Sequence, residues 1–459
     1  MSDIIEVFDP GNGELIGTVP SASGNDVEQV LATASNASNI ARNVPTHLRI
    51  SVLRQVAEQL LQHQEEFARL IAREGIKTIR EARKEVSRCV ETLRICAEEA
   101  RRIDGATIAF DQMPGSENRF GYFKRLPVGV VLAITPYNDP LNLVAHKIGP
   151  AIAAGNAVIL KPHSSTPLSA NNLVELFAAT ELPAGILQLI TGSGAVIGDQ
   201  LVSDPRVHMV SFTGGPLVGH KVMAQAGLKK ISMELGSNCP TIVMGDADME
   251  LAVEATVSGA FWAAGQNCLH VQRVFIQNTH FEDFSKRFVE RTRRLKVGDK
   301  MDETTDMGPL ISDAAALKVS EIVQDAVACG ARILTGAECK DRYYQPTVLD
   351  QVSAHCRISK EEVFGPVVAL YKFSEIQEAI DLANNVDYGL QAGVFTRDLA
   401  TAHRIADALN CGGVMINDSS DYRIDAMPFG GTGSSGLGRE GVAHAILEMT
   451  ATKTYCFNL

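Results

Sequence analysis

Cys268 is the residue best suited by type and setting to covalent chemistry. It stands in a short polar break, Gly265-Gln266-Asn267-Cys268-Leu269-His270, between the apolar run 260–264 and the β-like run 274–276. A cysteine just after a glycine can sit at an exposed chain reversal, where its thiolate reaches a substrate. The alternative is a small buried hydrophobe, which is the usual state of a free cysteine. If Cys268 is a nucleophile, other parts of the chain must supply the base, the charge stabiliser and the electron acceptor.

Polar residues follow four short apolar runs between residues 128 and 236. They are Thr135-Pro136-Tyr137-Asn138 after 130–134, Lys161-Pro162-His163-Ser164 after 157–160, Thr213-Gly214-Gly215-Pro216 after 207–212, and Glu234-Leu235-Gly236 after 231–233. The runs are too apolar to face water and alternate with helix-like segments, which predicts a parallel doubly wound sheet. The polar residues should then gather at the carboxyl edge of the sheet, where such folds bind ligands.

The elements around this sheet follow from periodicity and turn residues. Amphipathic helices are predicted from Asp26, from Thr46 and over 80–103, and the strand-like run 120–126 follows them. A second α/β unit is predicted over 237–438, with strands near 241–244, 274–276, 367–370 and 393–396. The glycine-rich run 430–436 has no strand-turn-helix context and is predicted to be a plain connecting loop, and 454–457 resembles a terminal strand.

Composition excludes several classes of protein. The chain has 459 residues, 45% hydrophobic and 21% charged, with 42 Lys+Arg against 54 Asp+Glu, and it carries no basic stripe for nucleic acid. Its N-terminus does not resemble a signal peptide, and no stretch has the uncharged apolar length of a membrane span. The nine cysteines contain no C-x-x-C pair, so neither a disulfide framework nor a metal site is expected. A cytoplasmic protein without membrane or nucleic-acid partners is predicted.

The order of the motifs resembles the NAD(P)-dependent aldehyde dehydrogenase superfamily over almost the whole chain. The matching motifs are Thr135-Pro136 with Asn138, Lys161-Pro162, Phe212-Thr213-Gly214, Glu234-Leu235-Gly236, Gly265-Gln266 with Cys268, Glu362-Val363-Phe364-Gly365-Pro366 and Pro428-Phe429-Gly430-Gly431. The resemblance implies a Rossmann-type cofactor domain over 1–113 and 128–236 and an α/β catalytic domain over 237–440. It also implies a β oligomerisation arm over 114–127 and 441–459, and hence a homodimer or homotetramer, because exposed strand edges are costly unless they are paired.

The resemblance implies that Cys268 attacks the aldehyde and that Asn138 and the Cys268 N–H stabilise the oxyanion. Glu234 is similar to the general base that hydrolyses the thioester, and its presence implies a free acid as product, because the CoA-acylating branch typically lacks it. Lys147 and Glu440 match a proposed proton relay. The alternatives are a turn or N-cap role for Asn138, a solvent-facing Glu234, a helix-surface Lys147 and a solvated Glu440.

For the cofactor, Lys161 resembles the residue that holds the adenosine ribose. Glu362 resembles the one that binds the nicotinamide ribose, and Phe364 should pack beside the ring. Glycine at 214 permits close approach to the pyrophosphate at a helix N-terminus. The full predicted dinucleotide set is Ile134, Thr135, Pro136, Tyr137, Lys161, His163, Ser164, Gly194, Phe212, Thr213, Gly214, Gly215, Val218, Leu235, Gly236, Glu362 and Phe364.

The chain departs from the family pattern at three cofactor positions. NAD-selective members usually carry a glutamate where this chain has Ser164, so NADP should be accepted, with Lys161 and His163 near its 2′-phosphate. Gly215 replaces a serine that is common in the family and removes one contact to the pyrophosphate. Tyr137 replaces the more usual tryptophan beside Asn138.

A small polar or anionic aldehyde is the predicted substrate. Arg88 resembles a position that binds an anionic group in the branch that oxidises phosphoglyceraldehyde, and Arg423, His270 and Asn267 add polar contacts. Arginine suits phosphonate, sulfonate, phosphate or carboxylate groups. The alternative is that Arg88 and Arg423 pair with nearby acids such as Glu85 and Asp425. The sequence also resembles lactaldehyde and phosphonoacetaldehyde dehydrogenases.

Two other classes of function remain open from sequence. One is a cofactor-independent cysteine hydrolase or acyltransferase that uses Cys268 with a histidine base, which leaves Lys161 and Glu362 without a purpose. The other is a non-catalytic structural protein that keeps the fold. That second hypothesis predicts the loss of Cys268, Glu234 or Asn138, and all three are present.

Overall fold

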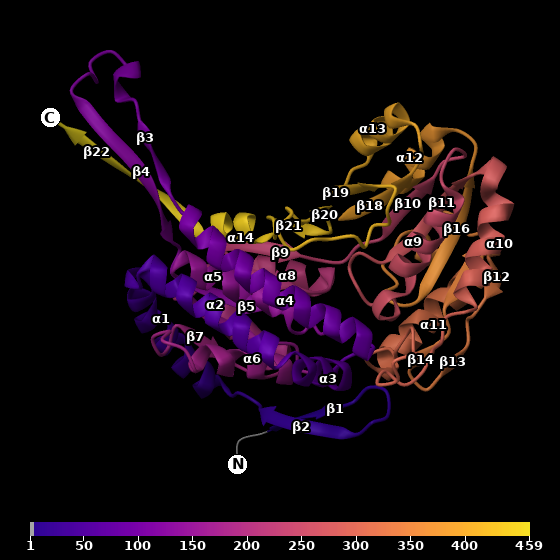
Figure 1. The fold of residues 1–459 in the computed structure, drawn as a ribbon, viewed down its shortest axis with the longest axis horizontal. Coiled ribbons are helices and arrows are strands. Elements are labelled where there is room, and N and C mark those ends of the chain that lie inside the picture. The colour runs from indigo at the N-terminus through magenta and orange to yellow at the C-terminus, as the bar shows by residue number, and fades with distance from the viewer. Residues whose placement is uncertain (1–3) are drawn as a thin grey trace.

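The computed structural model describes residues 4–459 and has two α/β lobes and a narrow β arm (Figure 1). Each lobe is built on its own sheet, and the arm projects from the lobe that contains the N-terminal helices. The predicted fold class is therefore confirmed. Residues 1–3, with which the predicted cofactor domain begins, lie outside the described part of the chain.

The first lobe is organised around a six-stranded sheet in the order β21-β9-β8-β5-β6-β7. Its strands are parallel except β21, which runs antiparallel to β9. Residues 130–133 and 157–161 are buried, as expected for strands covered on both faces. The strands are β5 (Val130–Ile134), β6 (Ala157–Lys161), β7 (Leu187–Leu189), β8 (Met209–Thr213), β9 (Lys230–Glu234) and β21 (Gly436–Leu437).

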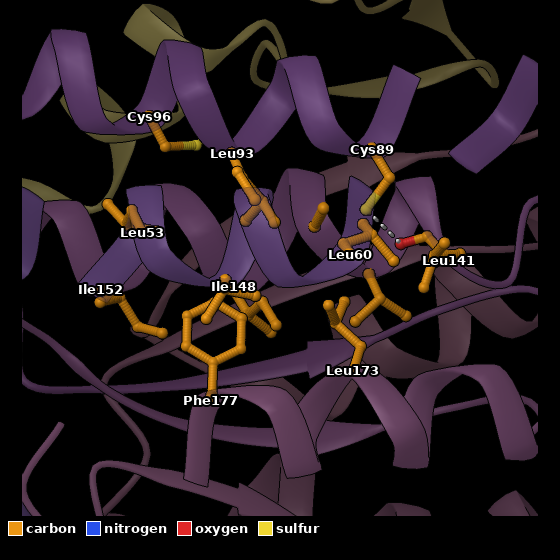
Figure 2. Close-up of a cluster of buried hydrophobic side chains, with 14 of the residues drawn as sticks. Leu53, Leu60, Cys89, Leu93, Cys96, Leu141, Ile148, Ile152, Leu173 and Phe177 are labelled. Atoms are coloured by element: carbon orange, nitrogen blue, oxygen red, sulfur yellow. Dashed lines mark hydrogen bonds between the residues drawn. The ribbon is translucent and has the colours of Figure 1, made fainter. Parts of the chain in front are cut away.

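Helices cover both faces of this sheet and enclose two hydrophobic cores. Figure 2 shows the larger one, in which Leu53 and Leu60 of α2 and Leu93 of α4 pack against α5 and α6. The helices of this lobe are α1 (Gly24–Asn43), α2 (Thr46–Gln62), α3 (Gln64–Glu74), α4 (Ile79–Glu99), α5 (Asn142–Ala154), α6 (Leu168–Ala178), α7 (Gly194–Ser203) and α8 (Pro216–Ala226).

The second lobe contains a seven-stranded sheet in the order β12-β15-β16-β11-β10-β18-β19. Only β12, which is antiparallel to β15, departs from a parallel arrangement. The strands are β10 (Cys239–Val243), β11 (Val271–Gln277), β12 (Arg332–Thr335), β15 (Thr347–Asp350), β16 (Val367–Phe373), β18 (Gln391–Phe395) and β19 (Gly413–Ile416). The helices are α9 (Met249–Phe261), α10 (Phe281–Thr292), α11 (Asp313–Ala328), α12 (Ile376–Asn384) and α13 (Leu399–Ala408).

The arm consists of β3 (Gly105–Ile108), β4 (Arg119–Pro127) and β22 (Thr450–Asn458), with β4 in the middle. The rings of Tyr122 and Tyr455 stack across β4 and β22 with centroids 5.0 Å apart. β3 therefore pairs in the arm although it lies inside the range 1–113. α14 (Val442–Glu448), which lies inside the predicted arm range, packs against α5 and α4 of the first lobe instead.

The glycine-rich run 430–436 is not the plain loop that its sequence predicted. β20 (Thr432–Gly433) pairs with β17 (Tyr388–Gly389), and β21 extends the first-lobe sheet beside β9. The run thereby connects β17, which precedes β18 of the second lobe, with the β9 edge of the first-lobe sheet. Its glycines allow this close approach because a side chain at 436 would meet the Met233 carbonyl. Two small hairpins complete the fold, β1 (Ile4–Phe8) with β2 (Leu15–Pro20) and β13 (Cys339–Lys340) with β14 (Tyr343–Tyr344).

None of the helices between residues 4 and 459 combines the length and the apolar character of a bilayer-spanning segment.

Candidate active site

The carboxyl ends of β5, β6, β8 and β9 open into one cavity of about 750 Å³ between the lobes. The structure confirms the prediction that polar residues gather at this edge of the sheet. Cys268 of the second lobe lines the same cavity as Asn138 and Glu234 of the first. The whole predicted dinucleotide set also lines it, namely Ile134, Thr135, Pro136, Tyr137, Lys161, His163, Ser164, Gly194, Phe212, Thr213, Gly214, Gly215, Val218, Leu235, Gly236, Glu362 and Phe364.

The loop that presents Cys268 is held in an unusual conformation. After α9, Ala263 and Ala264 adopt positive φ angles of 49° and 53°, which non-glycine residues rarely do. The Ala263 N–H donates to the Glu81 carboxylate at 2.8 Å, and the Ser237 hydroxyl donates to the Cys268 carbonyl. Cys268 is half-buried and faces the cavity, so it is not a core residue sealed in packed interior.

Cys268 and Glu234 both favour their neutral forms. Burial raises the pKa of the Cys268 thiol well above its ordinary value, and the positive charge of Arg423 opposes that rise. Burial, reinforced by the negative charge of Glu440, raises the pKa of Glu234 well above the usual range for a carboxyl. Within the described chain neither carboxyl oxygen of Glu234 has a hydrogen-bond partner. Glu234 is therefore a buried carboxyl group without a hydrogen-bond partner among the described residues, and the solvent-facing alternative is wrong.

Asn138 has little of its side chain exposed, 7%, and lines the cavity. It is not a helix cap, because α5 begins at Asn142 and Leu141 occupies its N-cap position. The next residue, Asp139, forms an ion pair with Lys77. The loop around Asn138 is thus tied to the start of α4.

Lys147 and Glu440 form a buried ion pair behind Glu234, with Nζ 3.0 Å from Oε1. Lys147 also donates to the Ser211 hydroxyl at 3.2 Å, and Arg423 contacts the other Glu440 oxygen at 3.2 Å. Burial opposes the charge of Glu440, but Lys147 and Arg423 together lower its pKa to about 2. The alternatives of a surface lysine and a solvated glutamate are wrong. Neither residue lines the large cavity.

One end of the cavity presents a cation without an acidic partner. Lys161 bonds only to the Pro162 carbonyl, at 3.3 Å, among the described residues, and burial lowers its pKa to about 8. Burial, followed by the charge of Lys161, lowers the pKa of His163 to about 4. The Ser165 N–H donates to His163 Nδ1, so the proton of the neutral ring belongs on Nε2. The Ser164 hydroxyl donates to the Gly192 carbonyl at 3.2 Å. These groups suit an anionic ligand.

The other end of the cavity is shaped by Glu362 and Phe364. Burial raises the pKa of Glu362 to about 7, and its carboxylate accepts the Ser237 N–H at 2.8 Å. A Cβ on Gly236 would lie 2.3 Å from a Glu362 oxygen, so only glycine fits there. Phe364 has a positive φ of 54° and meets the Tyr137 ring edge-on at a centroid distance of 6.0 Å. A carboxylate and an aromatic ring thus face the space near Cys268.

None of the four predicted substrate residues lines the large cavity. Arg88 makes a two-pronged contact with Asp425, at 2.7 and 3.3 Å, and Arg423 stacks on Phe429 beside Glu440. Both arginines therefore pair with acids, as the alternative held, although Glu85 is not the partner of Arg88. The Asn267 side chain braces its own loop through Trp262 and Leu269. His270 is buried, and burial lowers its pKa to about 3.

Several residues around the cavity had no prediction from sequence. They include Leu143, Asp199, Lys221 and Lys318. Lys318 lies on α11 and donates to the Glu362 carbonyl at 3.1 Å. Asp199 and Lys221 pair across α7 and α8 at 2.8 Å. The only signal for Leu143, Asp199 and Lys221 was a place in helices that follow strand ends, and that is too general to single them out. Lys318 lacked even this signal, because α11 follows α10 in the chain.

Comparison with known proteins identifies the family. Residues 1–455 match the aldehyde dehydrogenase family. The chain is 48% identical over 455 residues to aspartate-semialdehyde dehydrogenase 1 of Pseudomonas canavaninivorans, covering 99% of this chain and 97% of that protein. It is 44% identical over 455 residues to 3-sulfolactaldehyde dehydrogenase of Priestia aryabhattai, covering 99% and 95%. The crystal structure of glyceraldehyde-3-phosphate dehydrogenase from Methanocaldococcus jannaschii, complexed with NADP, superposes with a TM-score of 0.96 at 38% identity, covering 100% of both chains. The chain therefore belongs to the aldehyde dehydrogenase family, and it is an NAD(P)-dependent enzyme that oxidises aldehydes.

Proposed function

We propose that the enzyme oxidises a short anionic aldehyde to the free carboxylic acid and accepts NADP. The observation that carries this proposal is the single cavity lined by Cys268, Asn138, Glu234 and the predicted dinucleotide residues. A nucleophile, an oxyanion donor and a base are what acyl chemistry at an aldehyde carbon requires.

Cys268 is the nucleophile in this proposal. Its thiol must lose a proton before it adds to the aldehyde carbon, because the thiolate is the reactive form. Its raised pKa means that a base must take the proton, and Glu234 lines the same cavity. The adduct is a thiohemiacetal, and its oxygen takes hydrogen bonds from the Asn138 amide and the Cys268 N–H. A neutral amide fits this role because it does not titrate.

The dinucleotide, when bound, accepts the hydride that leaves the adduct carbon. Lys161 and His163 would hold its adenosine half and Glu362 its nicotinamide ribose. The three residues suit this ligand because they line one cavity and supply a cation, a ring N–H donor and a carboxyl acceptor. Cys268 then carries a thioester. Glu234, in its carboxylate form, activates the water that hydrolyses the thioester, and no hydrogen bond from another described residue occupies its oxygens.

Lys147 and Glu440 form the route by which Glu234 exchanges its proton. The buried pair lies close enough for Glu440 to raise the pKa of Glu234, so the three groups share one electrostatic environment. A charged ion pair that is buried without solvent is costly unless it is well bonded. The Ser211 and Arg423 contacts supply that bonding.

Acceptance of NADP follows from the adenosine end of the cavity. Ser164 bonds to the Gly192 carbonyl and places no carboxylate where a 2′-phosphate would lie. Lys161 supplies a positive charge, and His163 supplies an Nε2–H donor. The related enzyme from M. jannaschii was crystallised with NADP. These features support NADP as a cofactor of this chain.

An anionic substrate is supported by three relatives whose names refer to aldehydes with an anionic group. These aldehydes are aspartate semialdehyde, 3-sulfolactaldehyde and glyceraldehyde 3-phosphate. Other relatives, at 38–39% identity, are lactaldehyde dehydrogenases, whose aldehyde is uncharged. In this chain Arg88 is the candidate contact, because 27% of its side chain remains exposed despite its bond to Asp425. We also propose that the arm pairs with other copies of this chain to give a dimer or tetramer, since Phe120 and Phe457 are exposed on it.

The experiment that tests the proposal is a panel of short aldehydes assayed with NADP and with NAD. Carboxylate, sulfonate and phosphate aldehydes are compared with neutral aldehydes of equal length, and the acid product is identified by mass spectrometry. The proposal expects the largest kcat/KM for a charged member and measurable turnover with NADP. Turnover only with NAD, or a preference for neutral aldehydes, would contradict the corresponding part.

A further inference from the structure

The segment that enters α4 contacts both loops that carry the proposed catalytic groups. It runs from Lys77 to Glu85 and lies between the two lobes. Figure 1 shows α4 crossing the first lobe with one end directed toward the second lobe, and the Ile79 N–H at that end donates to the Lys300 carbonyl at 2.8 Å. The segment is therefore placed where it can set the distance between the loops.

On the first lobe, this segment fixes the residues that flank Asn138. The Lys77 ammonium bonds to Asp139 and, at 2.8 Å, to Glu85. The other Glu85 oxygen accepts the N–H groups of Leu141 and Asn142 at 2.8 and 3.0 Å. The loop after Asn138 is thus tied to α4 through side-chain and backbone groups, while the Asn138 amide faces the cavity.

On the second lobe, the same segment holds the loop that leads to Cys268. Glu81 is buried, and its two oxygens accept the N–H groups of Thr78 and Ala263, both at 2.8 Å. Ala263 has a φ of 49°. Such a conformation persists only where the surroundings hold it in place. The Glu81 bond is therefore a direct restraint on the turn that sets the position of Cys268.

The helix behind these contacts is itself firmly seated. Thr78 and Glu81 form a capping box at its start, and Cys89 and Leu93 pack into the core shared with α2 and α5 (Figure 2). The Cys89 thiol also contacts the Leu141 carbonyl at 3.9 Å. Because α4 is held firmly in the core, its contacts can keep the two loops at a fixed distance from each other.

We propose that Lys77 and Glu81 are positioning residues that set Asn138 against Cys268 across the two lobes. The inference rests on the proposed roles of Asn138 and Cys268. Asn138 and Cys268 lie in loops of different lobes, so no shared strand fixes their separation. Because oxyanion stabilisation requires donors placed to within a fraction of an ångström, a small shift of either loop should slow catalysis without removing a reacting group.

The first test replaces Lys77 with Met and measures the effect in two backgrounds. Lys77→Met is expected to lower kcat/KM by roughly 30-fold with NADP affinity unchanged, since a misplaced donor of about 1 Å costs up to about 100-fold. In an Asn138→Ala background, Lys77→Met should lower kcat/KM by less than about 3-fold, because Lys77 acts on the rate through the Asn138 amide, which is already missing. Equal losses in both backgrounds would refute the inference for Lys77.

Lys300→Met is the matched control for this test. Lys300 is an equally buried lysine whose ammonium pairs with Asp9 at 2.8 Å and donates to the Gly75 carbonyl at 2.8 Å, and it has no contact with the Asn138 loop. The Lys300→Met substitution should lower the melting temperature but leave the kcat/KM of the folded fraction within about 2-fold of the wild-type value, as expected for a purely structural contact. If Lys77→Met does not fold, Asp139→Ala breaks the same contact at a side chain that is 21% exposed, and it must show the same dependence on Asn138.

The second test replaces Glu81 with Gln and measures alkylation of Cys268 by iodoacetamide, followed by mass spectrometry of its peptide. A glutamine amide has one acceptor oxygen, so it cannot accept both N–H groups. We expect the alkylation rate of Cys268 to change by roughly 10-fold at fixed pH, since thiol reactivity depends on its local setting. Glu74→Gln is the control, because Glu74 is also buried and accepts two N–H groups, from Leu168 and Ser169, away from Cys268. Equal rates for both variants would refute the role of Glu81.

The parent variants separate this inference from the proposed function. If Cys268→Ala and Asn138→Ala both retain wild-type turnover, the proposed function is wrong. If both lose turnover while Lys77 and Glu81 variants behave like their controls, only the positioning role is wrong.

Discussion

The two halves of the active-site region differ in how they are built. The proposed dinucleotide half is built mostly from residues that follow four neighbouring parallel strands, with Glu362 and Phe364 added from the second lobe. The proposed substrate half draws on α4, the loop at 267–270 and the loop around Arg423, which belong to distant parts of the chain. Arg88 illustrates the second kind, since its partner Asp425 lies 337 residues away in the sequence.

This difference shows which parts of an active site follow from local sequence. A strand end is defined by the residues next to it, so its polar groups are placed once the sheet is known. The two arginines proposed for the substrate half are held by ion pairs, Arg88 with Asp425 and Arg423 with Glu440, and each pair can leave its arginine either facing a ligand or neutralised. Single substitutions can test the two halves separately, and the largest effect is expected at the nucleophile.

Cys268→Ala should show the clearest difference between the two halves, because it should abolish the reaction and leave dinucleotide binding intact. Removing the nucleophile is expected to lower NADPH production by about 10⁴-fold or more, as in other covalent enzymes. The Kd for NADP, measured by fluorescence titration, should change by less than about 2-fold, because the thiol acts in the chemical step and not in cofactor binding. Cys411→Ala is a control, since Cys411 is half-buried and lies outside the cavity. Retained oxidation in the Cys268 variant would remove the nucleophile assignment.

Glu234→Gln should slow thioester hydrolysis most, because that step needs a base to activate water. We expect steady-state turnover to fall by about 10³-fold, within the range for loss of a general base. A single burst of NADPH should remain but form more slowly, because Glu234 also takes the Cys268 proton. Because the pKa of Glu234 is raised by burial and by Glu440, the carboxylate fraction grows as pH rises. Wild-type thioester hydrolysis should therefore accelerate with pH, and the Gln variant should lose that dependence. Stopped-flow absorbance across pH measures both, and a pH-dependent Gln variant would contradict the assignment.

The sequence predicted much of the dinucleotide half because its signals are local. Apolar strands and the polar residues after them are enough to place Asn138, Lys161 and Glu234 at one edge of the sheet, and all three line the cavity there. The family resemblance then gave each a role. The buried state of Lys147 could not be predicted in this way, because an isolated helical lysine resembles any surface lysine. Its burial depends on the folded chain, which brings α5 and the segment before Glu440 together.

The glycine-rich run 430–436 shows a second limit of sequence reasoning. Its composition is typical of a loop, and no alternation of side chains marks β20 or β21. β21 forms along the β9 edge of the first-lobe sheet and β20 forms against the short strand β17, so both depend on backbone groups that the folded chain brings together. Such pairing depends on tertiary context and is not encoded in local periodicity.

Arg88→Met tests whether the substrate half binds charge. If Arg88 contacts the anionic group, kcat/KM for a charged aldehyde should fall by roughly 100-fold, the size of a lost charge-assisted contact. A neutral aldehyde of equal length should change by less than about 3-fold, since it never made that contact. If Arg88 only neutralises Asp425, both aldehydes should lose rate alike. Arg83→Met is the control, because Arg83 lies on α4 and pairs with exposed Glu65 and Glu303.

Ser164→Glu tests the dinucleotide half with the smallest expected effect. A carboxylate at this position would repel a 2′-phosphate and could bond to a 2′-hydroxyl. The kcat/KM with NADP should therefore fall by roughly 10-fold to 30-fold, because a close like-charge contact costs a few kcal/mol at most in a solvent-accessible site. The kcat/KM with NAD should stay the same or rise. Ser165→Glu, one residue further along and outside the large cavity, is the matched control. The ratio of the two cofactors at saturating aldehyde measures the switch. An unchanged ratio would mean that the 2′-phosphate does not lie near residue 164. The position of a residue at a strand end would then not be enough to predict which part of the dinucleotide it contacts.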